Sequence, residues 1–485
     1  MNFWKNIRQF GNRHLTKDGP ATVDLSEIDA ELAPPRRTAR SQSVAPPQNH
    51  EPIEVLTEYK RILELVQSKS HLIFVSGRAG TGKSTLIRFL THQVKNCAVL
   101  APTAMAASNV NGSTVHSFFN IPPRTINPEE VFDPRRMIGP VIGALEVLII
   151  DEISMVTPDI IDCISNSLQK ARRSSLPFGG VSVVFVGDLL QLPPVVRDPE
   201  VAKYYSDRYN SPFFYSADVF HQKGLVPVEL TRVFRQTDQE FIELLDQIRT
   251  NNNHEAAIEK INRECYHPDD SNRKFSLVLV PTIAAAQNIN TLNLNRLNAP
   301  LTVFEAIVEG GLNTESDRFQ APYRLEVKEG AQIVFVKNNK PNWMNGTQGR
   351  IVQIKDGRIH VEIKGTGNRV IVDRATWEKV EYSYDDKEQK IITNVVGSFK
   401  QFPFALGWAI TIHKSQGMTL DSAYIDFGEG AFCSGQAYVA LSRCRSLEGI
   451  SLARKITEKD VKADQTILKF YQLLRQRIES SSRAT

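Results

Sequence analysis

A glycine-rich segment constrains this chain more than any other part of its sequence. Residues 77–84 read Gly-Arg-Ala-Gly-Thr-Gly-Lys-Ser, which matches the pattern G-x-x-x-x-G-K-[ST]. The apolar run 71–75 precedes it, and a stretch with helical periodicity begins at Lys83. Glycines allow a tight turn between strand and helix, so that successive backbone N–H groups and the helix N-terminus point at an anion. The pattern therefore predicts a site for the phosphates of a nucleotide.

Each residue of this segment has an expected part in binding the nucleotide, for which ATP is the prediction. Lys83 is expected to reach the outer phosphates, and the Ser84 hydroxyl is expected to bind Mg²⁺. The residues expected to line the nucleotide are Gly77, Arg78, Ala79, Gly80, Thr81, Gly82, Lys83, Ser84 and Thr85.

Two further strands are predicted to deliver polar side chains to the same place. The apolar run 147–150 ends in Asp151 and Glu152. We expect Asp151 to hold Mg²⁺ and Glu152 to orient or deprotonate the attacking water. The run 181–186 is followed by Gln191, whose amide is expected near the γ-phosphate or that water. An acid pair after a strand is often only a helix cap, so the catalytic interpretation depends on the phosphate loop.

The rest of the chain predicts an α/β protein in two similar parts. From Thr57 onward, short apolar strands alternate with helical stretches, which is typical of parallel sheets. A second set of this kind follows residue 230, with a helix expected at 239–249 and strands at 277–280, 423–426 and 450–452. Between 325 and 399, short strands are separated by turn sequences such as Asn345-Gly346, which predicts a small antiparallel barrel inserted in the second part.

Composition excludes several other classes of protein. The charge is nearly balanced, with 58 basic and 54 acidic residues, and 41% of the residues are hydrophobic. These values are ordinary for a globular protein and exclude a mostly disordered chain or a collagen. The five cysteines form no C-x-x-C pair, so neither a zinc site nor a disulfide framework is indicated. The apolar runs are too short for a membrane span, and no membrane partner is predicted.

Eight sequence blocks, in order, resemble those of superfamily-one helicases. They are G-R-A-G-T-G-K-S-T, A-P-T-A-M-A-A (101–107), V-H-S-F-F (115–119), I-I-D-E-I-S-M-V (149–156), the block from Phe178 to Val195, T-R-V-F-R-Q (231–236), A-I-T-I-H-K-S-Q-G (409–417) and Y-V-A-L-S-R-C-R (438–445). More narrowly, the chain resembles the petite-integration-frequency (Pif) type, which is related to RecD and the phage protein Dda. The resemblance extends from about Thr57 to Ala453.

The resemblance implies two RecA-like domains with ATP between them, an SH3-like barrel inserted in the second and a short wedge insertion in the first. The implied divisions are a flexible N-terminal tail (1–50), a first domain (51–228) with its wedge at about 120–139, a second domain in two parts (229–324 and 401–470) that flank the barrel (325–400), and a C-terminal tail (471–485).

Further site residues come from the resemblance alone. Arg235 and Arg443 match the two arginines that reach the γ-phosphate and, with Lys83, Glu152 and Gln191, complete the expected catalytic set. Gln416 and Gly417 match the block that senses that phosphate. Positions that match DNA contacts are Thr103, His116, Ser117, Thr411, His413 and Ser415.

Two positions depart from the family pattern, and one of them is Gly407, which stands where the block P-F-x-L-A-W usually has alanine. Where relatives carry a glutamine that reads adenine, this chain has Tyr59 or Lys60.

For stacking against the bases of DNA, the aromatic candidates are Phe118, Phe119 and Trp343.

The implied activity is ATP-driven, 5′-to-3′ translocation on single-stranded DNA by a monomeric motor. The motor would unwind DNA junctions and forks, RNA–DNA hybrids and G-quadruplexes. Its implied roles are in repair, recombination and telomere maintenance. Replication or repair partners would bind the N-terminal tail. Such a protein would act in the cytoplasm (nucleoid) of a bacterium, or in the nucleus or an organelle of a eukaryote. Two alternatives remain open: a RecD-like motor subunit of a recombination complex, and a nucleotide-gated protein that binds single-stranded DNA without directed motion.

Overall fold

The computed structural model describes residues 21–23, 53–68, 71–122, 124–127, 130, 138–196, 198–266, 276–312 and 319–482. Most of the predicted N-terminal tail therefore lies outside the described residues, as does half of the predicted wedge at 120–139. Within the tail, strand β1 (Ala21–Val23) pairs antiparallel with β2 (Ile53–Val55). Among the described helices, none is long and apolar enough to cross a membrane.

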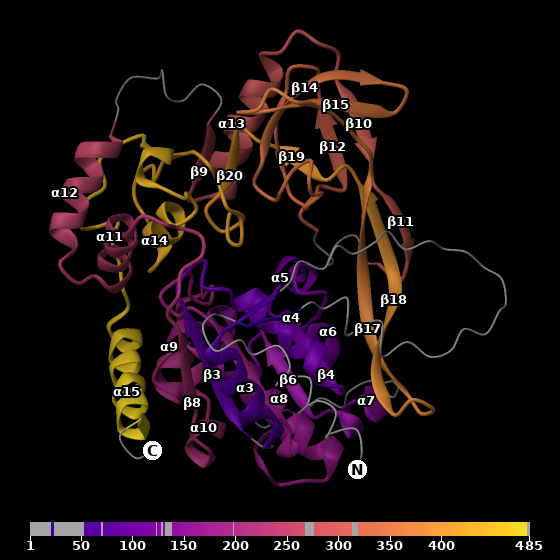
Figure 1. The fold of residues 1–485 in the computed structure, drawn as a ribbon, viewed down its shortest axis with the longest axis vertical. Helices are drawn as coiled ribbons and strands as arrows, with labels where there is room; N and C mark the ends of the chain where they lie inside the picture. Colours follow the sequence, from indigo (N-terminus) through magenta and orange to yellow (C-terminus); the bar gives the residue numbers. More distant parts are fainter. Residues whose placement is uncertain are drawn as a thin grey trace.

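A six-stranded parallel sheet forms the centre of what we call the first lobe (Figure 1). Its strand order is β5-β4-β6-β7-β3-β8. The strands are β3 (Leu72–Gly77), β4 (Cys97–Ala101), β5 (Ser113–Thr114), β6 (Val147–Ile150), β7 (Ser182–Gly187) and β8 (Val226–Leu230). The predicted strands of the first part are thus confirmed. The last of them, β8, pairs with β3 through Leu230, slightly beyond the predicted limit at residue 228.

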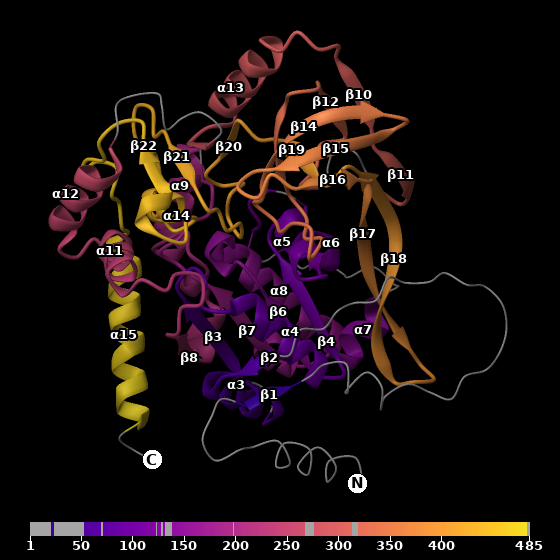
Figure 2. The same cartoon turned by 45° about the horizontal axis from the view of Figure 1, so that its top comes forward.

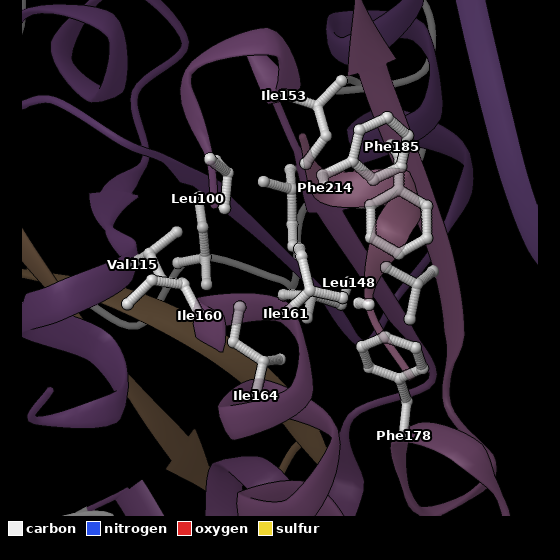
Figure 3. Packing of buried hydrophobic residues seen from close by; sticks show 14 of the residues in the cluster. Leu100, Val115, Leu148, Ile153, Ile160, Ile161, Ile164, Phe178, Phe185 and Phe214 are labelled. Carbon is white, nitrogen blue, oxygen red and sulfur yellow. The ribbon is translucent and has the colours of Figure 1, made fainter. Parts of the chain in front are cut away.

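Helices cover both faces of this sheet, which explains why its strands are apolar without alternation. Ile73 and Val75 of β3 pack with the helices α3 (Thr57–Gln67) and α4 (Lys83–Gln93). Their neighbours Leu72 and Phe74 face the opposite side. There, α8 (Pro158–Arg172) packs its isoleucines against Leu148 and Phe185 (Figure 3). The shorter helices of this lobe are α5 (Ala104–Asn109), α6 (Val115–Phe119), α7 (Gly139–Ala144), α9 (Pro199–Tyr209) and α10 (Val219–Gln222).

The second lobe is built on a four-stranded parallel sheet of order β20-β9-β21-β22. Its strands are β9 (Leu277–Val280), β20 (Ala409–Thr411), β21 (Ala423–Ile425) and β22 (Ile450–Leu452). Its helices are α11 (Gln239–Thr250), α12 (His254–Cys265), α13 (Ile283–Asn295) and α14 (Gln436–Leu441). This arrangement confirms the prediction of a second parallel unit.

Antiparallel strands fill the predicted insertion, but their pairing extends beyond its expected limits of 325 and 400. A five-stranded sheet has the order β16-β15-β14-β13-β19. Its strands are β13 (Gln332–Phe335), β14 (Gln348–Lys355), β15 (Arg358–Ile363), β16 (Arg369–Val372) and β19 (Phe404–Leu406). On the N-terminal side, β10 (Thr302–Glu305) pairs with β12 (Arg324–Val327), and β11 (Ile307–Gly310) pairs with β18 (Lys390–Gln401).

A long hairpin of β17 (Ala375–Asp385) and β18 extends from this region along the first lobe (Figures 1 and 2). The two-residue strand β5 pairs with β4 only at Leu100 and Ala101. Beside that pair, the Tyr382 hydroxyl of the hairpin donates to Val99 O at 3.0 Å and accepts from Val99 N at 2.9 Å. A side chain thus satisfies the backbone of β4 where β5 does not reach. The prediction of short barrel strands did not anticipate this hairpin.

The prediction of a C-terminal tail at 471–485 is wrong. Helix α15 (Gln465–Ser482) continues through most of it and packs on the first lobe, although residues 401–470 were assigned to the second domain. Ile467, Tyr471 and Leu474 lie on one helical face and join the core of the first lobe. The Phe470 ring stacks on Tyr215 with a centroid distance of 4.0 Å. The chain therefore crosses back to the first lobe at its end.

The hairpin contact leads to a test of stability. In Tyr382→Phe the ring remains, but the buried N–H and C=O of Val99 lose their partner, so the free energy of unfolding should fall by about 1–3 kcal/mol. Urea denaturation measures this loss. Tyr384→Phe is a matched control on the same strand, because the Tyr384 hydroxyl forms no hydrogen bond with any residue that the structure describes. Equal losses in the two variants would contradict the assignment.

Candidate active site

The phosphate loop joins β3 to α4, as predicted. Gly80 and Gly82 have φ angles of 79° and 86°, in the left-handed region that favours glycine. Gly80 also has no room for a side chain, since a Cβ there would lie 2.5 Å from Arg235 Cβ. The loop is therefore packed directly against the segment that carries one of the predicted catalytic arginines.

Lys83 is held over the loop that it belongs to. Its Nζ donates to Gly77 O at 2.9 Å and to Arg78 O at 3.0 Å. Burial lowers the pKa of Lys83, while the charges of Asp188 and Glu152 favour its protonated form. The ammonium thus lies near the predicted catalytic carboxylate.

The predicted acid pair lies at the end of β6. Asp151 Oδ1 accepts from Glu152 N at 2.9 Å, and Glu152 has a φ of 49°, an uncommon conformation for a residue other than glycine. Burial, together with the neighbouring Glu152, raises the pKa of Asp151 to about 7. Burial also raises the pKa of Glu152. Both carboxyl groups would be stabilised as anions by an added cation.

Two glutamines connect the lobes at this point. Gln416, from the second lobe, donates through Nε2 to Glu152 Oε2 at 3.1 Å and to Gln191 Oε1 at 3.3 Å. Gln191 in turn donates to Asp188 Oδ2 at 3.3 Å. The structure therefore brings together Glu152, Gln191 and Gln416, which the sequence analysis placed around the γ-phosphate. Gly417, next to Gln416, has a φ of 80°.

The two predicted arginines lie at the same junction. Arg235 Nη1 donates to Ser442 O at 3.2 Å. Arg443 is 1% exposed and donates to groups of its own lobe, with Nε 2.7 Å from Val439 O and Nη1 3.3 Å from Ser415 O. Burial, together with the charge of Arg235, lowers the pKa of Arg443 to about 9. The two guanidinium groups are close enough to repel each other.

The charges of this junction favour an anionic ligand. Lys83 and Arg235 are half-buried, Arg443 is buried, and burial lowers the pKa of all three. A cation removed from water is destabilised unless an anion compensates it. A triphosphate bound between the lobes would supply that compensation to all three side chains at once.

The same site has residues that fit Mg²⁺. Ser84 is in the first turn of α4, and the buried Asp151 is at the end of β6. Across the part of the chain that the structure describes, no group of three or more His, Cys, Asp or Glu residues could hold a metal ion. Mg²⁺ commonly binds proteins through one or two side chains and takes its other ligands from phosphate and water. The donor set fits a metal that arrives with a nucleotide.

A buried ion pair between the lobes was not predicted. Arg249 of α11 donates to Asp188, with Nη2 2.8 Å from Oδ1, and both side chains are at most 2% exposed. Burial alone would raise the pKa of Asp188, but Arg249 outweighs it and lowers that pKa. Each residue read alone follows a common pattern, an acid after a strand and a basic residue late in a helix, so no local signal could pair them.

Two aromatic residues, Tyr59 and Phe234, lie beside Gly82 at the end of the phosphate loop and differ in exposure. Tyr59 is 1% exposed and donates to Gly82 O at 2.8 Å, so its hydroxyl already has a partner. Phe234 is 44% exposed, and a Cβ on Gly82 would lie 3.6 Å from its ring. The sequence analysis missed Phe234, although it precedes Arg235 in a block already noted there.

The predicted DNA contacts differ in their exposure. Thr103 caps α5 by accepting from Ala106 N, and His116 and Ser117 are half-buried on α6. Ser415 is fully buried and donates to Ile412 O, and Thr411 is 5% exposed. Those two hydroxyl groups are thus withdrawn from the surface in this structure.

Among aromatic side chains, the three candidates for base stacking are buried: Phe118, Phe119 and Trp343 are at most 6% exposed and belong to hydrophobic cores. Phe432, which the sequence analysis did not select, is 58% exposed. Its ring is parallel to that of His413, with a centroid distance of 5.9 Å. This pair replaces the buried aromatic residues as the candidate for base stacking.

Comparisons with known proteins agree with this geometry. The sequence pattern of the PIF1-like helicase family matches residues 54–259. The ATP-dependent DNA helicase Pif1 of Bdellovibrio bacteriovorus is 31% identical over 429 residues, which cover 86% of this chain and 92% of the relative. The human ATP-dependent DNA helicase PIF1 is 31% identical over 84% of this chain, a match that covers 62% of the human protein.

Solved structures extend the likeness to the whole fold. Bacteroides sp. Pif1 in complex with ADP-AlF4 has a TM-score of 0.80 and 35% identity over 87% of this chain and 97% of that one. Bacteroides Pif1 bound to single-stranded DNA has the same coverage and a TM-score of 0.63. Because the Bdellovibrio relative is 31% identical over 92% of its own length, and the Bacteroides structure is 35% identical over 97% of its chain, this chain belongs to the PIF1-like helicase family.

Proposed function

We propose that this chain, by its family an ATP-dependent DNA helicase, hydrolyses ATP between its two lobes and moves 5′ to 3′ along single-stranded DNA. The observation that carries the proposal is the charge arrangement at the junction. Cations from the loop, from the connecting segment and from the second lobe meet there, and burial lowers the pKa of each despite the neighbouring carboxyl groups. One of those carboxyl groups, Glu152, is hydrogen-bonded across the junction by Gln416.

The proposed roles follow from position and chemistry. Lys83 neutralises the outer phosphates, and Arg235 and Arg443 stabilise the charge that develops during phosphoryl transfer. Glu152 orients or deprotonates the attacking water, and the amides of Gln191 and Gln416 orient the groups around it. Mg²⁺ bound by Ser84 and Asp151 would supply charge neutralisation at the phosphates.

Movement along DNA is proposed to come from lobe closure. Residues of both lobes would bind the γ-phosphate, so its presence favours the closed arrangement and its loss permits opening. Each lobe carries candidate DNA contacts, with Thr103 and His116 in the first and His413 in the second. Backbone contacts and base stacking carry little sequence information, so we expect binding that is largely independent of sequence.

The finer parts of the proposal come from family resemblance. We infer that the antiparallel region acts as an SH3-like accessory domain, that the segment 120–139 is the wedge, and that the motor works as a monomer on forks and junctions. Unwinding of RNA–DNA hybrids and G-quadruplexes is part of the same expectation. One Bacteroides Pif1 structure is of two coordinating helicases on forked double-stranded DNA, which supports a forked substrate.

A tailed-duplex assay tests the direction of motion. With ATP, the chain should unwind a duplex that carries a 5′ single-stranded tail and leave one with a 3′ tail intact. With a non-hydrolysable analogue in place of ATP, the 5′-tailed duplex should also stay intact. Equal unwinding of both tails, or binding without unwinding, would instead favour a nucleotide-gated DNA-binding protein, and activity only with added subunits would favour a RecD-like component.

Phe234 provides a second test, at the base of the nucleotide. We propose that its exposed ring stacks on adenine, an interaction expected to contribute about 1 kcal/mol. Phe234→Ala should therefore raise the KM for ATP about five- to tenfold with little change in kcat, as steady-state ATPase assays would measure. Phe234→Trp keeps an aromatic surface and should retain a KM near the original. An unchanged KM in Phe234→Ala would exclude the stacking role.

A further inference from the structure

Tyr438, in the short helix α14 of the second lobe, contacts the phosphate loop. Its hydroxyl accepts from Ala79 N at 3.0 Å, across 359 residues of sequence. The side chain is 3% exposed, and it belongs to a hydrophobic cluster that is formed mainly by the second lobe and includes Ala79 and Leu192 of the first. The Tyr438 side chain therefore lies where the two lobes meet.

The start of the same helix also rests on the first lobe. Gly435, the residue before α14, has a φ of 74°. A Cβ at Gly435 would lie 2.1 Å from Gln191 O and 2.5 Å from Leu190 O, so the backbone of the helix start touches the loop that carries Gln191. Helix α14 therefore contacts the first lobe at two points, its N-cap residue Gly435 and Tyr438.

The end of α14 holds both catalytic arginines. Ser442, which follows the helix, offers its carbonyl oxygen to Arg235 Nη1 at 3.2 Å and to Gln236 Nε2 at 3.2 Å. Arg443 is the next residue, and its Nε donates back to Val439 O in the helix. A shift of α14 relative to the phosphate loop would move Arg443 directly and would displace the acceptor of Arg235.

The hydroxyl of Tyr438 is unsuited to proton transfer. Burial raises the pKa of Tyr438 to about 12, so the group remains neutral at physiological pH. It lies on the side of the loop where Arg78 forms an ion pair with Asp246 of α11, with 3.2 Å between Arg78 Nε and Asp246 Oδ1. The Tyr438 hydroxyl can therefore serve as a hydrogen-bond acceptor that aligns α14 with the phosphate loop.

We propose that Tyr438 is a positioning residue for ATP hydrolysis: its hydrogen bond to Ala79 aligns α14 with the phosphate loop, so that Arg235 and Arg443 reach the γ-phosphate together. This inference rests on the proposed function of the two arginines. Because the alignment matters most when charge develops on the transferred phosphoryl group, removal of the hydroxyl should act on kcat and leave KM nearly unchanged.

Tyr438→Phe removes the hydroxyl and keeps the ring. In DNA-stimulated ATPase assays of the full chain, kcat should fall about tenfold, the effect of one lost hydrogen bond, with KM within twofold. Affinity for ADP with aluminium fluoride, which imitates the transferring phosphoryl group, should fall about as much as kcat, while affinity for ADP alone should not change. Tyr205→Phe is the matched control, since Tyr205 is a buried tyrosine of the first lobe whose hydroxyl donates to Asp159. That control should keep the kcat of the original chain.

A double-mutant cycle with Arg443→Ala separates positioning from general destabilisation. Because Tyr438 is proposed to act through both arginines, Tyr438→Phe should lower kcat by clearly less than tenfold in the Arg443→Ala background, where only its effect through Arg235 remains. An undiminished tenfold loss in that background, or a normal kcat in Tyr438→Phe alone, would overturn the inference and leave the proposed function intact. A normal kcat in Arg443→Ala would overturn both, because the arginine that Tyr438 is proposed to position would have no role.

Discussion

Desolvation of positive charge where the two lobes meet is the constraint on which the rest of this structure depends. Lys83, Arg235 and Arg443 come from three distant segments, and each loses hydration at the junction. Their mutual repulsion opposes closure of the lobes unless an anion is present. Burial raises the pKa values of Asp151 and Glu152, so a nearby cation would stabilise their carboxylate forms. A nucleotide with its metal would compensate both sets of charges, so we expect it to stabilise the junction.

Several contacts hold the lobes together around this charged centre without using the ligand. The buried pair Asp188–Arg249 lies beside it, and α15 returns from the second lobe to pack on the first. At the far side, the hairpin β17–β18 is bonded to β4 through Tyr382. These contacts join the two lobes independently of the charged groups at the junction.

Local sequence predicted the parts of this site that a strand and its following loop determine. The phosphate loop, the acid pair and Gln191 each follow an apolar strand, and parallel strands bring their ends to one edge of a sheet. What local patterns could not reveal are pairings across the chain, such as Tyr438 with Ala79 or Arg249 with Asp188, because either partner alone is a common residue in a common place. Helix α15 was predicted as a tail for a related reason, since its apolar face has meaning only against a core formed elsewhere.

We propose that one nucleotide is bound by both lobes of this chain, and a crystal structure with ADP, aluminium fluoride and Mg²⁺ would test this proposal. We expect the guanidinium groups of Arg235 and Arg443 to leave their present carbonyl partners and to lie about 3 Å from the fluoride atoms, opposite Lys83. A complex in which the nucleotide contacts the first lobe alone, with both arginines still bonded to backbone carbonyls, would contradict it.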